Sequence, residues 1–216
     1  MRLVIGNKCY SSWSLRPWLA MRALGIDFEE ELITFGEPDF KERVLAVSGA
    51  GLVPVLVDGD VVVWDSLAIL EYLAERFPKA GVWPSRFAAR AHARSISAEM
   101  HSGFAALRRT CPMNLGKRFH ARDRGPDVAG DVARIVELWG AALDGFADRD
   151  QGPFLYGAFT AADAMYAPVV LRFRTYGINL PESAGFYPQR LLQSSAMQEW
   201  LAAAETEVEV LSLIHI

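Results

Sequence analysis

Two different residue periodicities follow one another along this chain of 216 residues, and the change between them limits the folds open to it. Up to Phe77, short apolar runs typical of strands alternate with helical segments, whereas from Ser85 onward only helical spacing remains. The stretch between them, residues 78–84, contains two prolines and one glycine, which interrupt both patterns. We therefore expect two domains of different class, at residues 1–80 and 85–216.

The first region begins with a strand, a helix and a second strand. Its pattern predicts strands at Arg2–Ile5 and Glu31–Phe35 and a helix at Leu15–Leu24, which Gly25 ends. A short connection of this kind is right-handed, so the two strands should be parallel.

A hairpin and a helix complete the first region. The residues Asp58-Gly59-Asp60 separate two Val-rich runs at Val53–Val57 and Val61–Trp64, which is a strong signal for an antiparallel hairpin. An amphipathic helix follows at Ser66–Phe77, where Pro78 ends it. This order of elements resembles a thioredoxin-like domain of the α/β class.

The second region has the spacing of an all-helical domain. Helical periodicity is present in four segments: Phe87–Arg109, Asp127–Asp148, Ala161–Tyr176 and Pro188–Glu207. Thr160 and Asp163 have the spacing of a capping box, in which each side chain accepts from the main-chain N–H of the other residue. This box predicts the start of the central helix of the domain.

Charge and cysteine content limit the kinds of partner and the cellular location that we expect for this protein. The net charge is −4 and lysine and arginine form no basic block, so nucleic acid is not an expected partner. No apolar stretch is long enough to cross a membrane, and the apolar N-terminus is too short for a signal peptide, which predicts a cytoplasmic protein. Cys9 and Cys111 are expected to be reduced thiols. Histidine, cysteine and carboxylate residues lack metal-ligand spacing, so no metal is expected.

Three short motifs carry groups suited to a thiol-containing peptide. Ser11-Ser12 stands at a predicted helix start, where main-chain N–H groups and the helix dipole stabilise a thiolate. Val53-Pro54 offers an extended main-chain edge, and Asp65-Ser66 supplies a carboxylate and a hydroxyl at another helix start. Each motif also has a purely structural interpretation, because serine and aspartate cap helices and proline begins edge strands.

The order and spacing of these motifs make the chain similar, over nearly its whole length, to the cytosolic glutathione transferase family. The segment from Ser11 to Arg16 resembles the Ser-Ser-Cys-Ser-x-Arg signature of the zeta class and related bacterial enzymes, with Trp13 in place of the cysteine. The resemblance implies a thioredoxin-like glutathione-binding domain, followed by an all-helical domain that binds the second substrate. It also implies a homodimer that uses glutathione as co-substrate in detoxification of a small electrophile.

The resemblance assigns roles to individual residues. It gives Ser11, with Ser12 as the close alternative, the hydrogen bond that stabilises the glutathione thiolate, and it places Trp13 at the glutathione and substrate sites. It also implies a cis peptide bond before Pro54, which lets the main chain of Val53 pair with the cysteinyl part of glutathione.

Further contacts are expected at the ends of the two ligands. By resemblance, Ser66 and Asp65 hold the γ-glutamyl carboxylate and amine of glutathione. His101, Phe104 and Arg108 are spaced three and four apart on a predicted helix, so they share a face that would line the second-substrate pocket. An aromatic ring beside a cation and an imidazole suits an electrophile with an acidic group.

Two other interpretations of the function remain open. Cys9 and Ser12 have the Cys-x-x-Ser spacing of a monothiol glutaredoxin, which would make Cys9 the nucleophile of a glutathione-dependent thiol transferase. The other is a non-catalytic interaction protein with the transferase fold. Leu211–Ile216 resembles the translation of a sequencing-library adapter, so we expect the natural chain to differ from about residue 210 onward.

Overall fold

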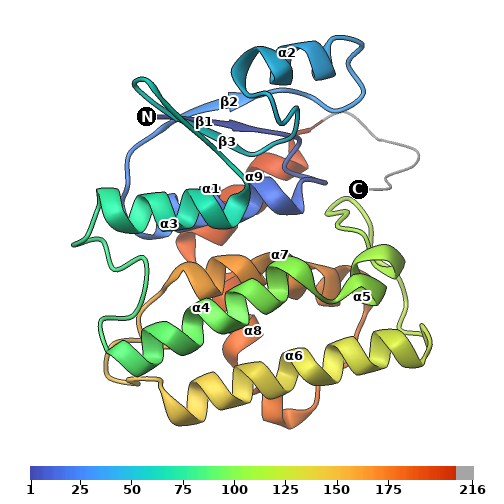
Figure 1. Ribbon diagram of the computed structural model, residues 1–216. Helices are drawn as coiled ribbons and strands as arrows, with labels where there is room; N and C mark the ends of the chain where they lie inside the picture. The colour runs from blue at the N-terminus through green and yellow to red at the C-terminus, as the bar shows by residue number, and fades with distance from the viewer. Residues whose placement is uncertain (208–216) are drawn as a thin grey trace.

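Figure 1 shows the computed structural model, which describes residues 1–207, so the suspected adapter segment lies outside the described residues. The first part of the chain forms a four-stranded sheet with three helices. The strands are β1 (Arg2–Ile5), β2 (Glu29–Leu32), β3 (Val55–Asp58) and β4 (Val61–Trp64), and the helices are α1 (Ser12–Ala23), α2 (Phe40–Val47) and α3 (Ser66–Arg76).

The strands lie side by side in the order β2-β1-β3-β4. β1 and β2 are parallel, with Leu3 opposite Glu30, and β3 and β4 form an antiparallel hairpin, which confirms the two predicted pairings. β1 also pairs with β3, in the antiparallel direction. Alternate side chains of β1 enter different clusters: Leu3 and Ile5 join the main core with α1, whereas Val4 packs with Val44 of α2. Helices therefore cover both faces of the sheet (Figure 1).

Two strand boundaries differ from the sequence prediction. The predicted strand Glu31–Phe35 lies too far along the chain, because β2 starts at Glu29 and ends at Leu32. The N–H of Phe35 donates to the Asn7 side chain (2.6 Å) instead of continuing the sheet. β3 begins at Val55, two residues later than predicted, because Pro54 has no N–H to donate to the strand ladder.

The rest of the described chain is mainly helical. The helices are α4 (Phe87–Ser102), α5 (Ala105–Thr110), α6 (Pro126–Gly145), α7 (Ala161–Tyr176), α8 (Tyr187–Gln193) and α9 (Ser195–Glu205), with a 3-10 turn at Glu182–Ala184. No helix within residues 1–207 combines the length and the apolar character needed to cross a membrane.

Two of the predicted helices are each divided into two. The segment Phe87–Arg109 breaks between α4 and α5, where Phe104 follows Gly103 and has left-handed dihedral angles (φ 56°, ψ 42°). The segment Pro188–Glu207 breaks at Ser194, whose extended backbone separates α8 from α9. The spacing of apolar residues continues across both breaks, so periodicity alone does not reveal them.

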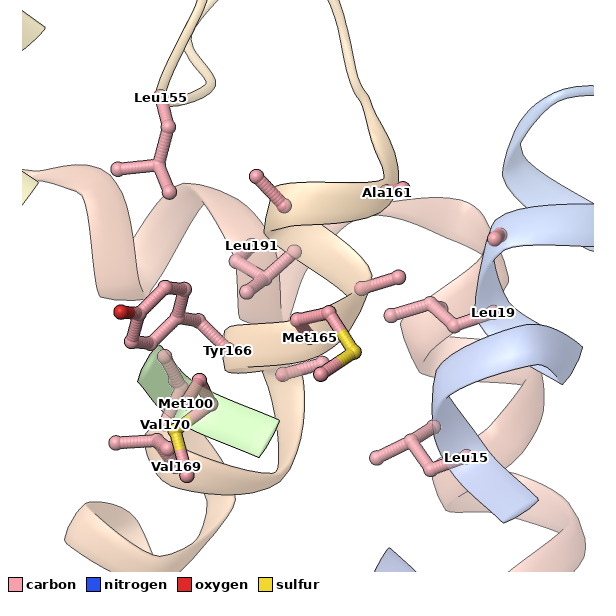
Figure 2. Close-up of a cluster of buried hydrophobic side chains, with 14 of the residues drawn as sticks. Leu15, Leu19, Met100, Leu155, Ala161, Met165, Tyr166, Val169, Val170 and Leu191 are labelled. Carbon is pink, nitrogen blue, oxygen red and sulfur yellow. The ribbon is translucent and has the colours of Figure 1, made fainter. Parts of the chain in front are cut away.

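Helix α7 is the buried centre of the helical part. It begins with the predicted capping box, in which the Asp163 carboxylate accepts from the Thr160 N–H (2.8 Å). Figure 2 shows Met165 of α7 facing Leu15 and Leu19 of α1, and all three side chains are fully buried. This contact holds the start of α1 against the central helix of the second domain.

Candidate active site

A cavity of about 380 Å³ opens beside the start of α1. Seven predicted site residues line it: Ser11, Trp13, Val53, Pro54, Asp65, Ser66 and His101. The other lining residues are Phe35, Phe40, Ala50, Leu52 and Trp64, which no sequence motif singled out. The three motifs of the first domain therefore meet around one cavity, and His101 of α4 adds a side chain from the second domain.

Ser11 caps α1 and lines the cavity. Its hydroxyl oxygen accepts from the Ser14 N–H (3.3 Å) and lies 2.7 Å from the Ser14 hydroxyl. The Ser14 oxygen in turn accepts from the Gly6 N–H (3.2 Å). In this structure the Ser11 hydroxyl donates to the Ser14 hydroxyl. If both hydroxyls rotate so that Ser14 donates to Ser11, the hydrogen of Ser11 becomes free for a ligand. A negative sulfur beside Ser11 would also lie at the positive end of α1.

Ser12 has a different environment and does not line the cavity. Its hydroxyl oxygen accepts a hydrogen bond from Nη2 of Arg172 on α7 (3.2 Å), and its side chain is buried. The structure thus separates two adjacent serines, since Ser11 faces the cavity and Ser12 faces the second domain.

The start of β3 forms a second wall of the cavity. The peptide bond between Val53 and Pro54 is cis, as the resemblance implies. Within residues 1–207, the main chain of Val53 makes no hydrogen bond with another residue. Its N–H and C=O are therefore available to an extended peptide bound along this edge.

The start of α3 forms a third wall. The Asp65 carboxylate caps this helix by accepting from the N–H of Leu67 (2.8 Å) and Ala68 (3.4 Å). The Ser66 hydroxyl is buried and has no hydrogen-bond partner among the described residues. A buried polar group without a partner is costly, so this hydroxyl favours a ligand that bonds to it.

Trp13 connects the cavity with the helical domain. Its ring meets the His101 ring edge-on at 5.2 Å, and His101 Nε2 lies 3.3 Å from Asp65 Oδ2. The guanidinium groups of Arg16 and Arg108 lie 4.1 and 5.5 Å from the centre of the Trp13 ring. An aromatic wall of the cavity is therefore backed by two cations.

The prediction that His101, Phe104 and Arg108 share one face of a single helix is wrong. His101 belongs to α4 and Arg108 to α5, because the chain leaves the helical conformation at Gly103. Phe104 is buried in the core and does not line the cavity. Arg108 nevertheless remains close to His101, since its Nη1 donates to the main-chain oxygen of His101 (3.2 Å).

Cys9 lies outside the cavity wall, which does not favour it as a nucleophile. Its buried sulfur is 3.9 Å from Asn114 Oδ1, and its N–H donates to the Glu207 carboxylate (2.9 Å). In the part of the chain that the structure describes, no group of three or more His, Cys, Asp or Glu side chains could hold a metal ion.

Comparison with known proteins follows the same division of the chain. The family model for the N-terminal domain of glutathione S-transferase matches residues 10–76, and that for the C-terminal domain matches residues 90–203. A zeta-class glutathione S-transferase of Euphorbia esula is 27% identical over 203 residues, covering 86% of this chain and 90% of the relative. A probable maleylacetoacetate isomerase of Caenorhabditis elegans is 28% identical over 171 residues, covering 78% of this chain and 77% of the relative.

Solved structures agree on the fold. A glutathione transferase homolog from Burkholderia, crystallised with bound glutathione, superposes with a TM-score of 0.71 at 22% sequence identity, covering 95% of this chain and 98% of that one. The N-terminal family match covers most of the sheet and its helices, and the C-terminal match covers most of the all-helical second part. The chain therefore belongs to the glutathione S-transferase family.

Proposed function

We propose that this protein is a glutathione transferase in which Ser11 stabilises the thiolate of bound glutathione. The observation that carries the proposal is that Ser11, at the N-terminus of α1, lines the same cavity as Val53-Pro54 and Asp65-Ser66. The thiol loses its proton to solvent and keeps the electron pair on sulfur. That sulfur then attacks an electrophilic carbon and forms the new carbon–sulfur bond, while the pair of the broken bond departs with a leaving group or, in an addition, moves onto the electrophile, which takes a proton from solvent.

The energetic demand on the serine is modest. A free thiol of this kind has a pKa near about 8.5, so only a few per cent is ionised at neutral pH. Lowering the pKa by one unit corresponds to about 1.4 kcal/mol, and a hydrogen bond to a charged group supplies about 1.5 to 3 kcal/mol. One hydroxyl at a helix N-terminus is therefore sufficient for useful activation.

The peptide part of glutathione would lie across the other two walls. The free main chain of Val53 pairs with the cysteinyl residue, and Pro54 keeps this edge turned toward α1. The Ser66 hydroxyl gains its missing partner from the γ-glutamyl carboxylate. Asp65 attracts the γ-glutamyl amine, because its carboxylate is half-exposed in the same wall.

The second substrate would meet Trp13, His101 and Arg108. Trp13 offers an apolar face, and the His101 ring on α4 and the Arg108 guanidinium on α5 lie beside it. Arg108 is only partly buried, so its guanidinium can approach a ligand. We infer a small electrophile that carries an acidic group.

We also propose that the protein is a homodimer located in the cytoplasm. Its two domains are proposed to divide between residues 80 and 85. Apolar side chains are exposed on the edge strand β4 and at the start of α4, where Trp64 is 55% and Phe87 is 80% exposed. A second copy of this chain would cover them. Light scattering should find a dimer, and Phe87→Glu should weaken it more than Phe186→Glu, which changes an equally exposed ring elsewhere.

Calorimetry and thiolate absorbance test the transferase function. Glutathione should bind, and the ultraviolet absorbance of the complex should show a thiol pKa below that of free glutathione. Ser11→Ala should return the pKa toward the free value with a smaller change in affinity, whereas Ser66→Ala should weaken binding and leave the thiol pKa low. Absence of glutathione binding by the wild-type protein would contradict the function, and an unchanged thiol pKa in Ser11→Ala would contradict the role of Ser11.

A further inference from the structure

Two fully buried guanidinium groups lie at the contact between α1 and α7. Arg16 is completely inaccessible and Arg172 is 4% exposed. Arg16 Nε donates to the main-chain oxygen of Met165 (3.3 Å), and Arg172 Nε donates to that of Cys111 (2.9 Å). Both nitrogens at the end of Arg16, and Nη1 of Arg172, have no hydrogen-bond partner among the described residues.

This pair of arginines makes no ion pair with a carboxylate in residues 1–207. Burying a charge without a counter-charge is costly, and burial lowers the pKa of Arg172 to about 10 and lowers that of Arg16 as well. An unpaired buried cation of this kind therefore favours an anion that the protein itself does not supply.

The neighbouring elements add more positive than negative charge. Arg108 of α5 raises the positive potential at both buried arginines. Of these three arginines, Asp131 of α6 acts on Arg108 alone. Asp65, at the start of α3, acts on Arg16 from the cavity wall, but its carboxylate already faces His101 of α4 (3.3 Å).

Apart from Asp65, the ionisable side chains that act on the pair carry no negative charge. These are Cys111, Tyr166 and Tyr176, and burial raises the pKa of each of them, so they stay neutral at physiological pH. The net field around the first turn of α1 is therefore positive.

We propose that Arg16 and Arg172 are positioning residues whose missing counter-charge is the thiolate of bound glutathione, an inference that rests on the proposed function. Arg172 acts through Ser12: its hydrogen bond occupies an acceptor site of that hydroxyl and sets the orientation of the residue next to Ser11. Arg16 acts through its contact with the ring of Trp13, which itself lines the cavity.

The physical basis is long-range attraction in a poorly screened interior. Two positive charges, one bonded to Ser12 and one against the ring of Trp13, favour the ionised over the neutral thiol even without touching the sulfur. The thiol proton goes to solvent, so no additional reactant is needed. Since Arg172 belongs to α7, activation of the thiol then depends on the second domain as well as on the glutathione-binding domain.

Titration of the thiolate absorbance of the glutathione complex tests this role. Arg172→Gln should raise the thiol pKa by about one unit, which is roughly a tenfold loss of thiolate at neutral pH. Arg172→Lys keeps the charge and should recover most of that loss. Arg174→Gln, an exposed arginine on the same helix, should leave the thiol pKa unchanged.

The outcomes separate this inference from the proposed function. If the wild-type complex shows no lowered thiol pKa, the proposed function fails; if the pKa is low but equal in folded Arg172→Gln, only the role of the arginines fails. Should Arg172→Gln not fold, Arg108→Gln is titrated in its place, because this residue is partly exposed and contributes to the same field. A smaller rise in thiol pKa is then expected, and no rise would overturn the inference.

Discussion

His101 Nε2 lies 3.3 Å from Asp65 Oδ2, so this contact links a helix of the second domain to the start of α3, where we propose that glutathione binds. The pair is partly exposed, which limits its free energy to about 1 kcal/mol or less. We expect His101→Ala to raise the KM for glutathione about two- to fivefold. Initial-rate kinetics would measure it, with the exposed His120→Ala as control. Equal KM values in the two variants would show that the pair does not position Asp65.

Ser14 links Ser11 to the end of β1. Its buried hydroxyl bonds to Ser11 (2.7 Å) and accepts from the Gly6 N–H (3.2 Å). Ser14→Ala leaves that buried N–H without an acceptor, so the free energy of unfolding should fall by about 1 to 3 kcal/mol. Urea denaturation measures this loss. Ser95→Ala removes an exposed serine hydroxyl and should change stability by less than about 0.5 kcal/mol.

Asp163 should make stability depend on pH between its unfolded and folded pKa values. Burial raises its pKa from 3.8 to about 6, so the folded state binds more protons than the unfolded state in this range. Its contribution to stability is therefore fully present below about pH 4 and is lost as pH rises through 6. A shift of this size corresponds to about 3 kcal/mol.

The Asp163→Asn variant isolates this pH dependence. It removes the titrating group, so the difference in unfolding free energy between wild type and variant should change by about 2 kcal/mol between pH 4 and pH 6. Denaturant unfolding at several pH values measures the difference. A constant difference across the range would refute the raised pKa.

Glu207 connects the end of the described chain to the turn that precedes Ser11 and α1. Its carboxylate accepts from the N–H of Lys8 (2.5 Å) and Cys9 (2.9 Å). Glu207→Ala should lower the free energy of unfolding by about 1 to 3 kcal/mol, because both N–H groups are largely buried. Thermal or urea unfolding measures this loss. Glu205 is exposed, so Glu205→Ala should have little effect in the same experiment. Loss of turnover without loss of stability would instead point to a direct part in catalysis.

Cys9 should be dispensable for turnover. Its sulfur is buried beside Asn114 and does not line the cavity. We expect Cys9→Ala to retain transferase activity within about twofold, since no reacting atom is removed. Assays of glutathione conjugation and of disulfide reduction by the variant would check this. Abolished activity in either assay would favour the thiol-exchange alternative.

Much of the fold follows from short-range signals. The Asp-Gly turn predicts the β3–β4 hairpin, and the spacing of Thr160 and Asp163 predicts the first turn of α7, because these signals need only a few neighbouring residues. The helix breaks at Gly103 and Ser194 have no comparable signal, since apolar spacing continues across them and tertiary packing decides where each helix stops.

The sequence alone determined the order of the four strands, the parallel pair and the hairpin, the change to an all-helical second part and the motifs that meet at the cavity. Only the tertiary structure separated Ser11 from Ser12 and placed Arg172 beside Ser12, a contact between residues 160 positions apart. The physical reason is range: caps and turns depend on neighbours in sequence, whereas the charge and hydrogen bonds around a thiol depend on whichever distant side chains the packing of α1 against α7 brings together.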